Sequence, residues 1–258
     1  MADAVDITWQ DHGAVGRVAR VTMHFSGRLN IVNTPALESF IPAMKGLSGE
    51  ADLRAVVLRG ADEAAFIGGA DIKEMVGLDR DSAEEFISRL HTACSMLRDM
   101  PVPVIADIRG FCLGAGLEVA AACDLRVAAE YSVFGMPEVH VGIPSVIEAA
   151  LLPGLIGWGR TRELLFTGRR IGATEAASWG LIERAAPADA VEGIVSEWLD
   201  GILRAGRRAI RLQKRLIRQW EDKPLGEAIK LGIACFRDAY TTDEPAIFMR
   251  RFLDRKKS

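Results

Sequence analysis

The feature that most constrains the fold is a recurring order of apolar run, glycine-containing turn and helix start. Residues 53–59 (LRAVVLR) and 102–108 (VPVIADI) are short runs rich in β-branched residues, which indicates buried strands. The turns at 68–71 and 114–116 follow them, and each turn leads into a helical pattern. Repeated strand-strand-helix units of this kind predict an α/β domain.

The remaining pattern extends this prediction along the chain. Alternation over 15–25 indicates a half-buried strand, and Thr34-Pro35 predicts a helix that begins with Thr34 as its N-cap. An apolar stripe predicts an amphipathic helix over 81–98 and consists of Phe86, Leu90, Ala93 and Leu97. From residue 153 onward the periodicity is helical, so we expect a trailing helical layer.

Composition excludes several classes of protein. The chain has 258 residues, with 32 Lys and Arg against 35 Asp and Glu, and a net charge of -3 offers no overall field for nucleic acid or a membrane. No apolar run is long enough to span a bilayer. The four cysteines form no CxxC pair, and we expect reduced thiols in the core. The opening residues carry acids where a secretory signal needs basic ones, so we expect a cytoplasmic protein.

Two glutamates stand among apolar residues. Glu118 lies in GAGLEVAAA (114–122), so we expect its carboxyl to be buried with a raised pKa. Glu138 follows Pro137 between apolar residues. Such a pair could serve as general acid and base if the fold brings them together. The plainer alternatives are a Glu118 that only stabilises a helix N-terminus and a Glu138 that is exposed in a loop.

The two glycine-containing turns offer backbone N–H groups at helix starts. Such groups can hold a phosphate or a developing oxyanion. The segment GAGLEV half-matches a dinucleotide-binding fingerprint, but Val119 stands where the third glycine is required. It also lies too far along the chain for a first βα turn. We therefore favour a phosphate or oxyanion site over a nicotinamide site.

Basic residues crowd one helical stretch at 204–218. They are Arg204, Arg207, Arg208, Arg211, Lys214, Arg215 and Arg218. Apolar residues run beside them, so a solvated basic helix face is the expected structure, with nucleic-acid binding as the alternative. The four histidines are dispersed, and we expect no metal site.

Three segments in this order resemble the enoyl-CoA hydratase/isomerase (crotonase) superfamily. They are AAFIGGADIKEM (64–75), IRGFCLGAGLEVAAACDLRVA (108–128) and FGMPEVHVGIP (134–144). The segment LLFTGRRIGATEAASWGLIERAAP (164–187) is similar to the stretch that follows the active site in that family. The resemblance covers nearly the whole chain, and three segments in register make it specific.

The resemblance implies an α/β fold of the crotonase-like (ClpP/crotonase) type. This is a spiral of repeated ββα units, here over 1–190, with a C-terminal helical trimerisation region over 191–258 that forms one family-level domain with it. It implies a homotrimer or a dimer of trimers. The implied substrate is an acyl-CoA thioester, with coenzyme A as part of the substrate and no tightly bound cofactor.

The resemblance also assigns roles to residues. The oxyanion-hole donors fall on the backbone N–H groups of Ala70 and Ala115. Glu118 would orient and activate water, and Glu138 would be the protonating acid. Coenzyme A and substrate contacts fall on Gly69, Asp71, Ile72, Lys73, Gly114, Phe252 and Arg255. Lys73 would approach the coenzyme A phosphates, and Phe252 and Arg255 would lie near the adenine bound in a neighbouring subunit.

The chain departs from the family at 145–149. The sequence SVIEA stands where the hydratases usually have Gly-Ala-Gly-Gly and then Thr. The resulting candidate substrate-pocket residues are Ile143, Val146, Ile147 and Glu148. Ala115 also replaces a Gly at the second donor.

Because isomerising members often keep only the glutamate at the position of Glu138, the presence of Glu118 favours an enoyl-CoA hydratase-type lyase. The first alternative is an isomerase or hydrolase in which residues 145–148 supply a new group. The second is a catalytically silent member that binds acyl-CoA or RNA.

Overall fold

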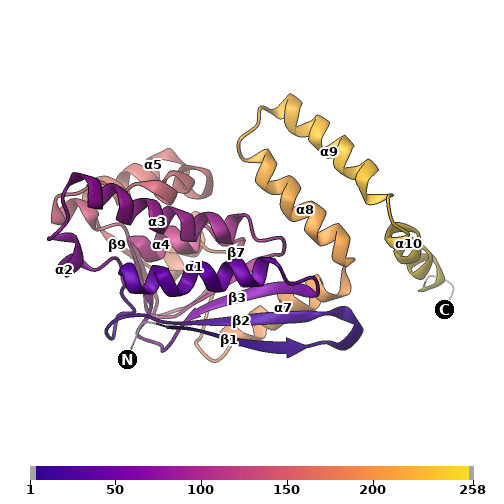
Figure 1. Ribbon diagram of the computed structural model, residues 1–258, viewed down its shortest axis with the longest axis horizontal. Helices are drawn as coiled ribbons and strands as arrows, with labels where there is room; N and C mark the ends of the chain where they lie inside the picture. The colour runs from indigo at the N-terminus through magenta and orange to yellow at the C-terminus, as the bar shows by residue number, and fades with distance from the viewer. Residues whose placement is uncertain (1–3, 256–258) are drawn as a thin grey trace.

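The computed structural model describes residues 4–255, and within them the strands form two sheets (Figure 1). The first sheet contains, in spatial order, β1 (Ala4–Asp11), β2 (Arg17–His24), β3 (Leu53–Gly60), β5 (Val104–Ile108), β7 (Leu125–Ala129) and β10 (Arg184–Ala186). The second contains β4 (Ala65–Ile67), β6 (Phe111–Leu113), β8 (Val133–Gly135) and β9 (Arg170–Gly172). Only the pairs β1–β2 and β8–β9 are antiparallel among these described strands.

The chain visits the two sheets alternately. β3 lies in the first sheet and β4 in the second, and β5–β6 and β7–β8 repeat this step. Each step shifts both sheets by one parallel strand, which produces a spiral of ββα units. The prediction of a crotonase-like α/β spiral is confirmed, and the predicted strands at 53–59 and 102–108 are β3 and β5.

Helices connect and cover the strands. The α-helices are α1 (Thr34–Ser48), α2 (Ile72–Met75), α3 (Arg80–Arg98), α4 (Ala115–Ala121), α5 (Leu152–Thr167), α6 (Ala173–Trp179), α7 (Val191–Arg204), α8 (Arg207–Trp220), α9 (Leu225–Ala239) and α10 (Glu244–Arg255). The 3-10 helices are η1 (Gly13–Val15), η2 (Glu138–Val141) and η3 (Ile147–Leu151).

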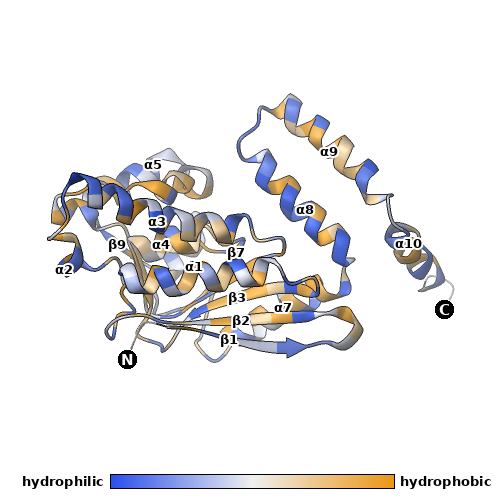
Figure 2. Ribbon diagram, viewed as in Figure 1, coloured by the Kyte–Doolittle hydropathy of each residue, from blue (hydrophilic) through white to orange (hydrophobic). Residues whose placement is uncertain are grey.

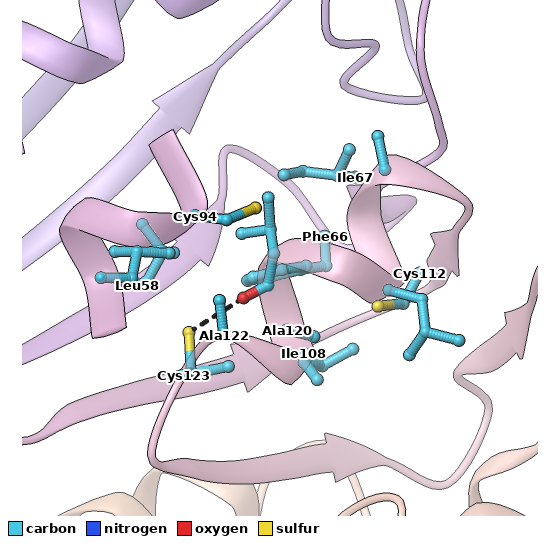
Figure 3. Close-up of a cluster of buried hydrophobic side chains, with 14 of the residues drawn as sticks. Leu58, Phe66, Ile67, Cys94, Ile108, Cys112, Ala120, Ala122 and Cys123 are labelled. Carbon is cyan, nitrogen blue, oxygen red and sulfur yellow. Dashed lines mark hydrogen bonds between the residues drawn. The ribbon is translucent and has the colours of Figure 1, made fainter. Parts of the chain in front are cut away.

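The first sheet is buried on both faces. Val56 and Leu58 of β3 pack into a cluster with α1, α3 and α4, whereas Ala55 and Val57 pack into a second cluster with α7. A strand that is covered on both sides needs apolar residues at every position, which explains its unbroken apolar sequence. Figure 3 shows the first cluster around α4, where the thiol of Cys123 donates to a backbone carbonyl of that helix.

The C-terminal helices leave the body of the molecule. α8 and α9 pack on one another, and Figure 1 shows α9 and α10 extending away from the sheets. α7 packs against the first sheet and α8 is hydrogen-bonded to the body through Arg211, Lys214 and Arg218, so the outlying part consists of α9 and α10. The division into 1–190 and 191–258 stays a prediction.

Two local predictions were wrong. Asn33, and not Thr34, caps α1, because its side chain accepts the N–H of Ala36 at 2.9 Å. Cys235 is only partly buried, although the other three cysteines are buried and all four thiols are free. The apolar stripe of α3 is confirmed as a buried face. Within residues 4–255 no helix is both long and apolar enough to cross a membrane.

Candidate active site

Two glycine-containing turns lie side by side at one edge of the second sheet. β4 and β6 are parallel neighbours, with Ile67 opposite Cys112, and each strand ends in one of the turns. A Cβ atom built on Gly69 in the first turn would lie 3.7 Å from the carbonyl oxygen of Leu113 in the second. Ligands of α/β folds commonly bind beyond the carboxyl ends of parallel strands, which is where these turns lie.

The first turn leaves the N–H of Ala70 without a protein acceptor. The N–H of Val32 donates to the carbonyl of Gly69 at 2.9 Å, and the N–H of Asp71 donates to the carbonyl of Val32 at 2.8 Å. These bonds use the peptide groups on both sides of Ala70, and its own N–H has no hydrogen bond within the described part of the chain. Asp71 then caps α2 by accepting the N–H of Lys73 at 2.8 Å.

The second turn likewise leaves the N–H of Ala115 without a protein acceptor. Gly114 has φ of 52°, a conformation that favours glycine, and its N–H donates to the carbonyl of Gly135 at 2.9 Å. Ala115 begins α4, so its N–H has no partner in the helix, and it has none elsewhere in residues 4–255. Two unpaired donors on adjacent turns can bind one oxygen atom that gains negative charge.

Glu138 lies directly over the second turn. A Cβ atom built on Gly114 would come within 2.3 Å of its Oε1, so only glycine leaves room for this carboxylate. The hydroxyl of Ser145 donates to its Oε2 at 2.7 Å. Glu138 begins η2 after Pro137 and is only partly buried, which places its carboxyl between the protein interior and solvent.

Glu118 lies in α4 with 5% of its surface exposed, which confirms the predicted burial. Burial is the largest cause that raises the pKa of its carboxyl to about 8, and the negative charges of Glu138 and Glu148 contribute in the same direction. The N–H of Ala149 donates to its Oε1 at 3.3 Å and acts in the opposite direction. The structure thus brings both predicted glutamates to the same pair of turns.

The departure at 145–149 forms a strained loop and η3. Ile147 has φ of 34°, which is rare for a β-branched side chain and costs on the order of 1–3 kcal/mol. Ile143 and Val146 are exposed at the mouth of this loop. Glu148 points the other way, towards α3.

Sequence reasoning missed the partner of Glu148. Its carboxylate is 2% exposed, and its two oxygens lie 3.0 and 3.2 Å from Nδ1 of His91. Arg98 adds an ion pair at 3.9 Å. The only sequence signal was that His91 shares a helix face with Cys94 and Arg98, three and seven residues further along α3.

The predicted coenzyme A contacts fall into two groups. Ile72 and Lys73 are exposed on α2, directly after the first turn. Phe252 and Arg255 belong to α10, and Figure 1 shows α10 at the opposite end of the molecule from α2. A single chain therefore does not bring the two groups together.

The basic residues of α8 are engaged by the protein itself, and Figure 2 shows how hydrophilic that helix is. Arg211 donates to the backbone carbonyls of residues 50, 51 and 53. Lys214 bonds the carboxylate of Asp124 at 2.6 Å, and Arg218 bonds Asp99 at 3.0 Å. A cavity of about 710 Å³ runs along this helix, and none of its lining residues belongs to the two turns or the glutamates.

Comparison with protein families gives one match over most of the chain. The family described as enoyl-CoA hydratase/isomerase matches residues 14–258. YngF of Bacillus subtilis strain 168 is 35% identical over 230 residues, which cover 88% of this chain and 86% of YngF. A short-chain-enoyl-CoA hydratase of Clostridium acetobutylicum is 30% identical, with 94% of this chain and 93% of that protein covered.

Solved structures agree with this match. The crystal structure of an enoyl-CoA hydratase from Bacillus anthracis superposes with a TM-score of 0.89 at 31% identity, and covers 96% of both chains. The similarity extends through the outlying C-terminal helices, since only a small part of either chain is left unmatched.

Proposed function

The chain belongs to the enoyl-CoA hydratase/isomerase family, and from this premise we propose that it adds water across the 2,3 double bond of an enoyl-CoA thioester. One observation carries the proposal. Two carboxyl groups, Glu118 and Glu138, flank a turn that also presents the unpaired N–H of Ala115. Hydration needs this combination, because it requires one group to activate water, one to deliver a proton and donors to hold the enolate.

The two turns would bind the thioester carbonyl. The N–H groups of Ala70 and Ala115 would donate to its oxygen, which becomes negative as water adds to the β-carbon and the double-bond electrons move towards the carbonyl. One such donor typically contributes about 3 kcal/mol to the barrier reduction. Both donors belong to the backbone, so they are held by the β4–β6 pairing and need no side-chain rearrangement.

The two glutamates would handle the protons. Glu118 takes a proton from the attacking water, the oxygen bonds to the β-carbon, and Glu138 gives a proton to the α-carbon as the enolate collapses. The charges balance, because one carboxylate gains a proton while the other carboxylic acid loses one. In the ligand-free protein the raised pKa of Glu118 places the proton on that carboxyl, so Glu118 must pass it to the carboxylate of Glu138 before water is activated.

A second candidate reaction is thioester hydrolysis through Ser145. Its hydroxyl donates to Glu138 at 2.7 Å, which is the geometry of a nucleophile beside a base. In this route Glu138 takes the serine proton and passes it to the leaving thiolate of coenzyme A while the acyl-serine forms, and water then cleaves the acyl-serine to release the acid. It predicts that intact-protein mass rises by one acyl group on mixing with a thioester, and that Ser145→Ala abolishes thiol release.

We propose that the active form is a homotrimer or a dimer of trimers. α9 carries an exposed apolar stripe made of Leu225, Ile229, Ile233 and Phe236, which Tyr240 extends directly after the helix. α10, which contains Phe252 and Arg255, lies at the opposite end of the molecule from α2, which contains Lys73 (Figure 1). A neighbouring copy would supply them to the adenine end of coenzyme A, with Lys73 near the phosphates.

The experiment is hydration of crotonyl-CoA followed by loss of the conjugated enoyl-thioester absorbance. Wild type should turn over, while Glu138→Gln and Glu118→Gln should each lower kcat by at least about 10²-fold. Glu227→Gln on the exposed surface of α9 is the matched control. An unchanged rate in Glu138→Gln contradicts the assigned chemistry, and release of free thiol in place of hydration selects the hydrolase.

A further inference from the structure

We propose that Glu148 is a positioning residue for Glu118: it ties η3 to α3 and so holds the backbone N–H of Ala149 on the Glu118 carboxyl. The inference rests on the hydration proposed above, in which Glu118 contacts the attacking water. Glu148 itself touches no substrate in this arrangement, since its carboxylate faces α3.

Glu148 is held firmly because its carboxylate is buried and paired. Only 2% of the side chain is exposed, and both oxygens lie within hydrogen-bond distance of Nδ1 of His91. Carboxylate oxygens only accept, so Nδ1 of His91 carries the proton. Moving Glu148 away from α3 would break this contact inside the protein, which is costly for a buried charge.

The next residue carries the effect to the active site. The N–H of Ala149 is shared between the carbonyl of Val146, at 2.9 Å, and Oε1 of Glu118, at 3.3 Å. A shared donor turns towards one acceptor when the backbone moves by a few tenths of an ångström. By fixing the backbone of η3, Glu148 therefore determines how strongly the N–H of Ala149 bonds to Glu118.

Backbone strain shows that the loop needs an anchor. Ile147 precedes Glu148 and has φ of 34°, a conformation that a β-branched residue leaves unless its surroundings hold it. Its neighbour on the C-terminal side is fixed by α3. Without Glu148, the backbone at Ile147 would relax and would carry Ala149 with it.

Charge gives the arrangement a measurable signature. Three groups face Glu118, namely Glu138 of η2, Glu148 of η3 and the thiol of Cys94 on α3. On its other side, Glu148 faces His91, Arg98 and the same Cys94, all on α3. The negative charge of Glu148 raises the pKa of Glu118, whereas the N–H of Ala149 lowers it and has the larger effect. A variant that loses both the charge and this donor should therefore raise the pKa of Glu118.

The test compares four variants by crotonyl-CoA hydration over a range of pH. Glu148→Gln removes the negative charge but keeps the shape of the side chain. His91→Ala removes the side chain that holds Glu148, and it does so from the exposed side. His91→Asn restores a hydrogen-bond donor near the position of Nδ1. His91 has 53% of its side chain exposed, so its variants should fold even if Glu148→Gln does not. The control is Glu183→Gln, which breaks the ion pair of Glu183 with Arg126 at 2.6 Å, outside the site.

We expect Glu148→Gln to lower kcat by at least about 10-fold with KM changed less than about threefold, since a misplaced group of this kind can cost up to about 10²-fold. The pH limb that belongs to Glu118 should move to higher pH, because the loss of the Ala149 N–H outweighs the loss of the Glu148 charge. A shift to lower pH would show that the charge was lost while the donor stayed in place, and would overturn the inference. His91→Ala should lower kcat in the same way and His91→Asn should recover most of it. Glu183→Gln should lower the midpoint temperature of thermal unfolding without moving the pH limb that belongs to Glu118.

The inference is overturned if Glu148→Gln and His91→Ala keep the wild-type kcat and pH limb, or if they change only the thermal midpoint as Glu183→Gln does. That result leaves hydration intact, provided that Glu118→Gln is inactive. If Glu118→Gln is as active as wild type, the proposed function fails and the positioning role fails with it.

Discussion

The carboxyl of Glu118 is buried in α4, and this burial makes its protonation state the quantity that links pH to both activity and stability. Its pKa is raised to about 8 by desolvation and by the charges of Glu138 and Glu148. Near neutral pH the ligand-free protein therefore holds a proton on Glu118. Two predictions follow from this one residue, and they concern different observables.

The first concerns the rate. Because the mechanism needs one proton on the Glu118–Glu138 pair, kcat/KM for crotonyl-CoA should fall as pH rises through about 8, where the pair loses that proton. Initial rates between pH 6 and 9.5 in buffers of constant ionic strength test this. A kcat/KM that instead rises through this range and levels off would show that the reaction needs no proton held by the pair, which would contradict the role of Glu138 as the acid.

The second concerns stability. A carboxyl whose pKa is raised on folding contributes stability below its unfolded pKa, and that contribution is lost as pH rises towards about 8. Glu118→Gln cannot ionise, so it should be more stable than wild type at pH 8.5, by on the order of a few kcal/mol, and the gain should shrink towards pH 5. Urea unfolding at both pH values measures it. An equal gain at both would show that ionisation is not the cause.

A third prediction concerns Gly114. Gly114→Ala introduces a Cβ atom 2.3 Å from Oε1 of Glu138, which must move away from the turn. We expect kcat to fall by about 10²-fold or more, because a displacement of about 1 Å has effects of this size. Gly13→Ala is the matched control: its φ of 59° is similar, but its Cβ would meet no atom within 4 Å. It should cost stability and leave the rate unchanged.

At the scale of helices and strands, sequence pattern predicted the features that depend on residues close by in the sequence. The buried strand β3 and the apolar stripe of α3 follow from periodicity, and the burial of Glu118 follows from the apolar residues around it. Even the error at the start of α1 was small, since Asn33 and Thr34 are both good capping residues and only the backbone decides between them.

The loop at 145–149 shows what such pattern cannot predict. A β-branched Ile147 favours extended backbone, yet the structure gives it a positive φ. Glu148 pairs with His91, which lies 57 residues earlier, and no local rule connects them. The sequence shows that the glycine stretch is replaced. It does not show that the replacing residues pack against α3, because that contact depends on the tertiary fold.

A fourth prediction concerns how α8 is attached. Nζ of Lys214 lies 2.6 Å from both oxygens of Asp124, and one of these also accepts the N–H of Val104 at 2.7 Å. Lys214→Met should destabilise the chain by about 3 kcal/mol, because it leaves a largely buried carboxylate without its cation. Chemical denaturation measures this. Adding Asp124→Asn should recover part of the loss, and no recovery would mean that the pair contributes through packing alone.

At the scale of the whole molecule, the apolar stripe on α9 stays exposed to solvent in a single chain. Isolated apolar residues on a surface are ordinary, but four on one helix face, with a fifth directly after the helix, form a patch typical of an interface. The stripe lies on the outlying part of the chain, away from both buried clusters (Figure 1).

A fifth prediction concerns assembly. Ile233→Glu places a charge in the centre of the stripe and should convert the proposed trimer or hexamer to smaller species, as measured by light scattering coupled to size-exclusion chromatography. Glu227→Lys, an exposed change outside the stripe, should leave the mass unchanged. If coenzyme A needs residues from a neighbour, Ile233→Glu should also raise KM. An unchanged mass would place the interface elsewhere.

The position of α9 in the sequence also sets an order of events during synthesis. The residues of both buried clusters, with the partly buried ones packed against them, end at Leu203, so the body of the fold is complete in the nascent chain before α9 emerges from the ribosome. Domains that are synthesised first can fold first. The surface that would join copies of the chain therefore reaches solvent only after the body of the fold, and the interval before it meets another copy becomes shorter as the local concentration of newly made chains rises.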